Sequence, residues 1–188
     1  MTSILVLNAG SSSLKFAVFE NLHPVLKGQV SGIGTASRFE ASGTEARTLA
    51  EITALPEAQA FVATWLANQG LEVRDFTGIG HRIVHGGTKY VIPIRVDDDI
   101  QTELEELQAL APLHQPFGFG VLRQMRRIAP DVPHIGCFDT AFHATQPELA
   151  TRLPIPREYH ARGYRRYGFH GLNYEHVVAA LPKITGKP

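Results

Sequence analysis

Residues 4–20, ILVLNAGSSSLKFAVFE, join two apolar runs through a polar turn. The first run ends at Leu7, and a second, alternating run begins at Leu14. Asn, Gly and Ser are ordinary turn residues, so one interpretation is a plain hairpin of two strands. The other is a phosphate-binding hairpin, because Gly10 allows a close backbone approach while hydroxyls and the Lys15 ammonium can contact phosphate oxygens. The GxxxxGK[ST] spacing of a Walker A loop is absent.

The composition is that of a globular protein with balanced charge. Its 188 residues can bury one good core and leave room for a second small unit. Lys plus Arg and Asp plus Glu both number 18, so net charge gives no support for a nucleic-acid or membrane partner. The single cysteine, Cys137, excludes an internal disulfide framework and fits a reducing compartment. We find no signal peptide and no membrane-spanning run, and we expect a cytoplasmic protein.

The apolar pattern predicts an α/β protein with a mixed sheet. Strands are expected over 4–7, 13–19, 24–31 and 134–139, with a buried strand that runs into a Gly-Gly turn over 76–87. Helices are expected over 56–69, after Asp97–Asp99, over 117–129 and over 172–181, the last ending before Pro182. A loop or weak strand is expected over 32–53, and a Pro- and Arg-rich loop over 147–166.

Polar side chains interrupt several apolar runs, which is costly unless the polar groups are paired or used. Arg82 lies in GHRIVHGG, and its guanidinium suits bidentate capture of a carboxylate or phosphate, or pairing with a structural carboxylate. Asp139 ends an apolar strand, where α/β proteins tend to place sites, although a cap or turn aspartate would look the same. His114 lies between two predicted helices, where a solvated side chain is the common case. His170 precedes a helix N-terminus, which attracts anions.

Two other kinds of site have weaker support. His81 and His85 are four residues apart, but in a strand this spacing puts them on one face and far apart, and neither HExxH nor CxxC occurs. Arg162, Arg165 and Arg166 lie beside tyrosines, as in some RNA-binding surfaces. The balanced charge and the lack of an RNA-binding signature favour a surface or domain-contact role for these arginines.

Five motifs, NAGSSSLK, GHRIVHGG, APLHQP, CFDTAFH and YGFHG, occur in the order found in acetate kinases. Over residues 4 to about 178, the chain resembles the N-terminal part of this family of short-chain carboxylate kinases. The resemblance implies the α/β fold of the superfamily of sugar kinases, actin and heat-shock ATPases, in which two related domains close over a nucleotide. By the same resemblance, residues 1–141 are the first domain, and 142–188 are the truncated opening of the second.

The resemblance also implies roles for single residues. Arg82 corresponds to the carboxylate-binding arginine, and Asn8 lies near the metal. The residues implied in catalysis are Asp139, His170 and His114. Those implied in nucleotide binding are Ser11, Ser12, Ser13 and Lys15. The chain departs from the family pattern at 172–174, where Leu-Asn-Tyr replaces the usual Thr-Ser-His, and at Gln115, where asparagine is commoner.

The implied reaction is reversible phosphoryl transfer from ATP to acetate, giving acetyl phosphate and ADP, with Mg²⁺ or Mn²⁺. The implied partners are acetate or another short-chain carboxylate and ATP or ADP, with a homodimer as a candidate assembly and no nucleic acid or membrane. A propionate or butyrate kinase and a non-catalytic regulatory or interaction fragment remain as alternatives. Family members are considerably longer, so we expect the chain to hold part of an active site and to be inactive alone.

Overall fold

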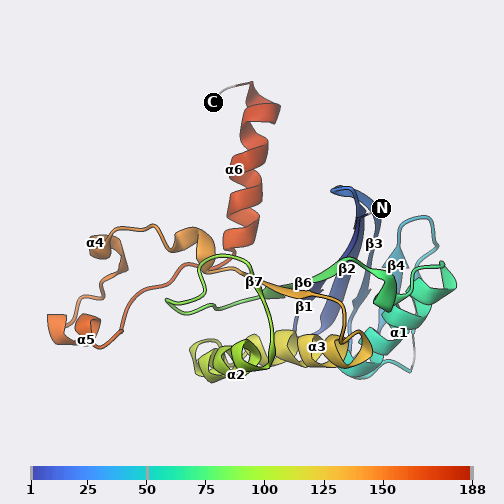
Figure 1. Ribbon diagram of the computed structural model, residues 1–188, viewed down its shortest axis with the longest axis horizontal. Helices are drawn as coiled ribbons and strands as arrows, with labels where there is room; N and C mark the ends of the chain where they lie inside the picture. Colours follow the sequence, from blue (N-terminus) through green and yellow to red (C-terminus); the bar gives the residue numbers. More distant parts are fainter. Residues whose placement is uncertain (1, 50, 187–188) are drawn as a thin grey trace.

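A mixed sheet forms the centre of the chain, and helices lie on both of its faces (Figure 1). The computed structural model describes residues 2–49 and 51–186. In this part of the chain, eight strands lie in the order β5-β4-β3-β2-β1-β6-β8-β7. Their bounds are β1 (Ser3–Ala9), β2 (Ser13–Glu20), β3 (His23–Ser31), β4 (Arg38–Ala41), β5 (Arg47–Thr48), β6 (Gly78–Ile83), β7 (Ile94–Arg95) and β8 (His134–Phe138).

The strand directions place a parallel centre beside an antiparallel meander. β1 is parallel to β6, and β6 is parallel to β8. β2 to β5 continue from β1 as antiparallel neighbours, and β7 joins β8 antiparallel at the other edge. The register sets Asn8 opposite Lys15 between β1 and β2. The carboxyl ends of β1, β6 and β8 therefore meet at one edge, where open α/β sheets place their ligands.

The helices cover the two faces unevenly. Below the sheet in Figure 1 lie α1 (Leu55–Asn68), α2 (Asp98–Glu106) and α3 (Gln115–Ile128), whereas α6 (Gly171–Thr185) rises from the other face. The short helices α4 (Glu148–Thr151) and α5 (Arg157–Ala161) belong to a segment that extends away from the sheet. Short 3₁₀ helices are η1 (Val73–Asp75), η2 (Leu107–Leu110) and η3 (Ala141–His143). Across the described ranges, none of the helices has the length and apolar character to cross a membrane.

Alternation along the strands decides which side chains enter the core. In β1, Leu5 and Leu7 are buried and belong to the core that α1 and α3 cover, whereas Asn8 faces the other side. Phe16 of β2 packs edge-on against Trp65 of α1, with ring centroids 5.8 Å apart. Burial of such apolar and aromatic groups holds the helices to one face of the sheet. Polar side chains on the opposite face of the sheet lie outside this core and remain accessible to a ligand.

Most elements predicted from the sequence are confirmed. The three N-terminal strands, the strand at the GHRIVHGG motif, the strand before Asp139 and the helices α1, α2, α3 and α6 are all present. Asp97 caps α2, because its carboxylate accepts a hydrogen bond from the Ile100 amide at 2.9 Å. The pattern does not predict β7, and the segment 147–166, expected as a loop, contains α4 and α5.

The prediction that the last helix ends before Pro182 is wrong. α6 runs through this proline to Thr185, and Gly186 caps it in the left-handed conformation with φ of 67°. A proline inside a helix removes one hydrogen bond and leaves the carbonyl of the residue four positions earlier, here Val178, without its partner. Val178 is 56% exposed, so this proline lies in a part of the helix that faces solvent.

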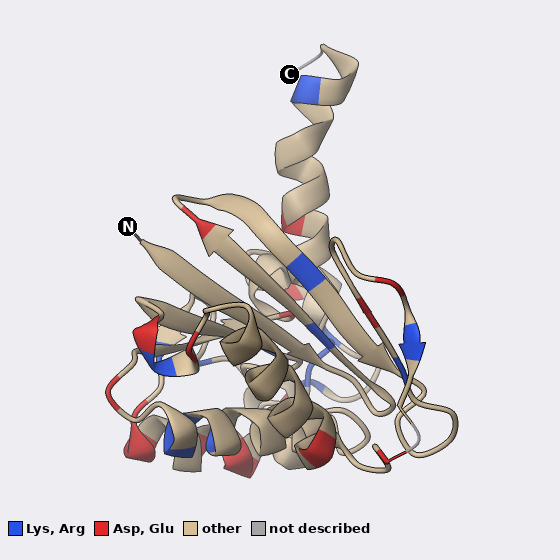
Figure 2. Cartoon of the chain, turned by 90° about the vertical axis from the view of Figure 1, so that its right-hand side faces the viewer, with Lys and Arg blue, Asp and Glu red and all other residues tan. Residues whose placement is uncertain are grey.

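Much of α6 is exposed and apolar. Figure 2 shows the helix almost free of Lys, Arg, Asp and Glu, and Gly171 is its buried residue. The large apolar side chains that it exposes are Tyr174, Val177, Val178, Leu181 and Ile184. The predicted domain division after residue 141 stays a prediction.

Candidate active site

Three polar side chains meet at the carboxyl ends of the parallel strands. Asn8 lies near the end of β1, Arg82 near the end of β6, and Asp139 directly after β8. The order β1-β6-β8 makes these strands neighbours. The Asp139 amide also donates to the Ile83 carbonyl at 3.0 Å, which extends the pairing of β8 with β6 by one residue. The aspartate is thereby fixed beside the arginine by backbone structure.

Arg82 is bonded to both of the other side chains. Its Nε lies 3.1 Å from each oxygen of the Asp139 carboxylate, and its Nη2 lies 2.5 Å from Oδ2. Its Nη1 donates to Oδ1 of Asn8 at 3.0 Å. The Asp139 side chain is 2% exposed and that of Arg82 is 26% exposed. A buried carboxylate is costly without a partner, and the guanidinium supplies that partner for Asp139.

His170 is held above this pair in an unusual backbone conformation. It is the N-cap of α6 with φ of 58°, a left-handed conformation that is uncommon outside glycine. The next amide, that of Gly171, donates to the Asp139 carbonyl at 2.8 Å, and a Cβ at Gly171 would lie 2.2 Å from that oxygen. The glycine therefore permits the close approach. His170 Nδ1 lies 4.0 Å from Oδ2 of Asp139, and its side chain is 74% exposed.

A cavity of about 320 Å³ lies next to these residues. Its polar lining comes from Arg82, Asp139, His114 and His170. Its apolar lining comes from Val84, Leu110, Ala111 and Phe169. The cavity therefore joins an arginine and two histidines to a short apolar wall, which matches a small amphipathic anion.

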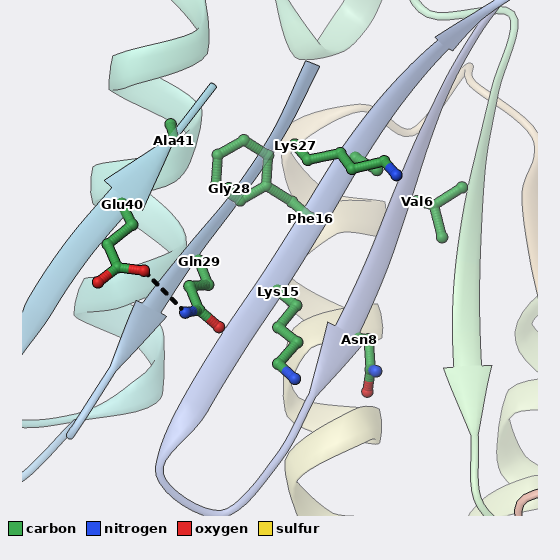
Figure 3. A pocket seen from close by; sticks show the side chains of 10 residues that line it. Val6, Asn8, Lys15, Phe16, Lys27, Gly28, Gln29, Glu40 and Ala41 are labelled. Carbon is green, nitrogen blue, oxygen red and sulfur yellow. Dashed lines mark hydrogen bonds between the residues drawn. The ribbon is translucent and has the colours of Figure 1, made fainter. Parts of the chain in front are cut away.

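Lys15 lies in a separate hollow on the open face of the sheet. This groove of about 460 Å³ is lined by Asn8 and Lys15, among others, and Figure 3 shows the two side chains next to each other on neighbouring strands. Because Asn8 also binds Arg82, it links the Lys15 groove to the arginine. Lys15 is exposed, as expected for a group that meets a ligand from solvent.

Ser11 and Ser12 lie in the turn that follows β1, and Ser13 begins β2. The Gly10 amide donates to the Ser13 carbonyl at 2.8 Å, which closes the hairpin, and Ser11 and Ser12 are exposed. Ser11 lines another hollow together with Gln59. Asn8, Arg82, Asp139, His114 and His170 are thus brought together, with Lys15 next to Asn8. The serines lie beyond Asn8, on the turn and at the start of β2, and do not line the Arg82 cavity.

The sequence analysis did not identify the apolar wall of the cavity. Val84 and Phe169 are neighbours of motif residues, so their positions in GHRIVHGG and YGFHG were the available signal. Leu110 and Ala111 come from the end of η2 and the residue after it. These two residues line the same cavity as Arg82, about 28 positions earlier in the chain, and a sequence pattern confined to neighbouring residues cannot show this.

The side-chain oxygens of Asn8 and Asp139 are of the kind that a hydrated divalent ion binds. In the ranges 2–49 and 51–186, no group of three or more His, Cys, Asp or Glu residues is placed to hold a metal. Asn8 and Asp139 present oxygens that already accept from Arg82. A carboxylate and an amide oxygen retain further lone pairs, and Mg²⁺ commonly keeps several waters and relies on substrate phosphates.

The comparison with known families agrees with this arrangement. The family model described as Acetokinase family matches residues 3–188. The chain belongs to the acetokinase family. Its fold is accordingly that of the sugar kinase, heat-shock ATPase and actin superfamily, a mixed-sheet α/β domain.

Curated relatives and solved structures support membership of the acetokinase family. The chain is 42% identical to the acetate kinase of Nitrobacter hamburgensis and 39% identical to that of Rhizobium meliloti, and it covers 48% and 50% of their lengths. These matches extend over 98% and 100% of the chain. The whole chain also superposes on half of a Francisella tularensis propionate kinase (TM-score 0.86, 30% identity) and half of the Porphyromonas gingivalis acetate kinase (0.85, 29%). The chain therefore spans about half the length of its relatives.

Proposed function

We propose that this chain supplies the carboxylate-binding side of an active site that transfers a phosphoryl group between ATP and acetate. The observation that carries the proposal is the cavity of about 320 Å³, in which Arg82 and two histidines meet an apolar wall. A small molecule with a carboxylate at one end and a methyl group at the other matches that lining. The products would be acetyl phosphate and ADP.

The hydrogen bonds of Arg82 leave it able to hold a carboxylate. Each terminal nitrogen of a guanidinium carries two N–H groups. The bonds to Asp139 and Asn8 account for one on Nη2 and one on Nη1, so a second N–H on each nitrogen remains. An arginine fixed by two partners loses little side-chain freedom when it binds a further anion, which favours precise placement of the substrate.

Asp139 is better suited to orienting Arg82 than to removing a proton. Its carboxylate is nearly inaccessible and accepts three bonds from the guanidinium. The acid substrate is already ionised near neutral pH, so its attack on phosphorus needs no general base. We assign to His170, exposed beside the cavity, and to His114 on its wall the donation of hydrogen bonds to the oxygens of the phosphoryl group in transfer.

The nucleotide side of the proposed site is incomplete in this chain. We assign contacts with the phosphates of Mg²⁺-ATP, the co-substrate, to Lys15 and the serine turn, and Asn8 contacts both the Lys15 groove and Arg82. When bound, the ion would neutralise phosphate charge. Phosphoryl transfer depends on positioning and on charge neutralisation around the phosphate, which needs groups on both sides of it. We assign the remaining groups to the part of the relatives' length that this chain does not cover.

Propionate is a second candidate substrate. Two observations favour it: the similarity to a solved propionate kinase, and the four apolar residues that line the cavity beside Arg82. A longer aliphatic tail would gain contact with that wall, since each added methylene that is buried contributes about 0.8 kcal/mol.

The test is an NMR titration of the 188-residue chain with acetate, propionate and butyrate. We expect the amides of Val84, Phe169 and His170 to shift with a carboxylate, and Arg82→Lys to abolish the shifts because an ammonium cannot bind both oxygens. Arg95→Lys, at an exposed position on β7, is the matched control and should bind as the unmodified chain does. Carboxylate binding that survives Arg82→Lys would contradict the proposed site. No binding by the unmodified chain would favour the non-catalytic alternative.

A further inference from the structure

We infer that Gln115 is a positioning residue that sets the width of the cavity beside Arg82, acting through His85. The inference rests on the proposed function, because it concerns how the carboxylate pocket is shaped. Neither residue lines the cavity. Both are buried polar residues, each 1% exposed, in a region where burial without partners would be costly.

The Gln115 side chain binds both backbone groups of His85. Its Nε2 donates to the His85 carbonyl at 3.0 Å, and its Oε1 accepts from the His85 amide at 3.4 Å. His85 lies two residues beyond the end of β6, so neighbouring strands do not satisfy these groups. Gln115 is the first residue of α3. The amide therefore acts as a spacer of fixed length between the end of β6 and the start of α3.

The His85 ring continues this connection to a third segment. Its Nδ1 accepts a hydrogen bond from the Gly87 amide at 2.9 Å, which fixes the ring and places the ring proton on Nε2. The ring packs edge-on against Tyr167 at 4.4 Å and against Phe169 at 5.8 Å between centroids. Burial lowers the pKa of His85, the same direction as the acceptor role that the Gly87 amide gives to Nδ1.

Each end of this relay is adjacent in sequence to a residue that lines the cavity. Val84 precedes His85, His114 precedes Gln115, and Phe169 itself contacts the His85 ring. Lengthening or shortening the spacer would therefore move Val84 relative to His114, and both residues line the cavity. A glutamine is one methylene longer than an asparagine, so it holds these two lining residues farther apart. The geometry points to Gln115 as a determinant of which acid chain length fits.

The experiment compares Gln115→Asn, Gln115→Ala and Tyr167→Leu with the unmodified 188-residue chain. Gln124→Ala is the matched control, because Gln124 lies on the same helix and its amide contacts Pro56 instead of His85. Without ligand, both Gln115 variants should shift the amides of Gly87 and of residues 167–170, and the control should not. With ligand, Gln115→Asn should change the ratio of propionate to acetate dissociation constants by about threefold or more.

A double-mutant cycle separates positioning from simple structural support. Tyr167→Leu leaves the Gln115 bonds intact and, since Tyr167 is only half-buried, should fold. In a double-mutant cycle with Gln115→Ala, the effects on acetate affinity should be non-additive, because both changes interrupt one relay. Additive effects, or unmoved 167–170 amides in folded Gln115 variants, would overturn the inference. If the unmodified chain binds no carboxylate, the proposed function fails, and the ligand-free shifts still test the relay.

Discussion

The acid sensitivity of this chain should depend on His81. This residue is 3% exposed on the helix-covered side of β6, where its Nε2 lies 3.0 Å from Nδ1 of His134. His134 Nε2 lies 3.0 Å from the Ala129 carbonyl and must donate to it, so His134 Nδ1 is the acceptor and His81 is the donor. Each ring therefore carries one proton. Protonation of either ring adds a buried charge next to the other ring, and burial, with a smaller contribution from Arg126, lowers the pKa of His134.

The size of the effect follows from the pKa of His81. Burial, with a smaller contribution from His134, lowers this pKa from 6.5 to about 3. Because the pKa of His81 is lower in the folded than in the unfolded chain, the contribution of His81 to stability is fully present above pH 6.5. That contribution is lost as the pH falls toward 3. At pH 5, His81 is protonated in the unfolded chain, because its pKa there lies about 1.5 units above the pH. At about 1.36 kcal/mol per unit, the free energy of unfolding at pH 5 is therefore lower by ~2 kcal/mol. For a chain of this size that corresponds to a melting temperature lower by about 4–8 °C.

Urea unfolding at pH 7 and at pH 5 measures how much of the free energy of unfolding depends on His81. His81→Gln keeps a donor for His134 but cannot titrate, so it should lose about 2 kcal/mol less than the unmodified chain between the two pH values. The difference between pH values is the readout, since the substitution also changes packing at both. His23→Gln, at an exposed position on β3, should behave like the unmodified chain. Equal pH dependence in all three proteins, or a His81 ring found protonated by NMR at pH 5, would refute the reasoning.

Further predictions concern the site and α6. The kinetic predictions concern a fusion of this chain with the second half of one of its relatives. In that fusion, Arg82→Ala should raise KM for acetate and lower kcat, and Arg82→Lys should restore little of either. There, Asp139→Asn should lower kcat and also cost about 2 kcal/mol in urea unfolding, because it leaves Arg82 poorly paired. Calorimetry of this chain with Mg²⁺-ATP should give an affinity no better than roughly millimolar, with no hydroxylamine-trapped acetyl phosphate. Hydrogen exchange should be faster over 174–185 than over β1, since that part of α6 has no buried side chain.

Sequence patterns were sufficient where structure is local. The alternation around Leu14 predicts β2, and Asp97 predicts the start of α2, because strand faces and helix caps depend on nearby residues. β7 has only two residues, Ile94 and Arg95, and exists because it pairs with β8 about 40 residues away. A segment that short carries no periodicity, so its pairing could not be predicted.

The site was predictable in part for a related reason. Arg82 and Asp139 are conspicuous because they are polar in apolar runs, but their bond to each other joins positions 57 residues apart. The His81–His134 contact spans 53 residues and is invisible in both local patterns. Gln115 stands next to a candidate histidine, yet nothing in APLHQP indicates that its amide binds the His85 backbone. Sequence therefore identifies chemically capable residues, and the sheet order decides which of them meet.

The carboxylate side and the nucleotide side of the proposed site differ in how far they are already formed. Arg82 is fixed by Asp139 and Asn8, and Asp139 is almost fully buried, so the group that we propose to bind the acid is in place before a ligand arrives. Lys15 is exposed, and contacts from exposed charges contribute little to affinity. We therefore expect discrimination among short acids to be a property of this chain. Affinity for ATP, and with it turnover, should depend on groups that enclose the phosphates from the other side.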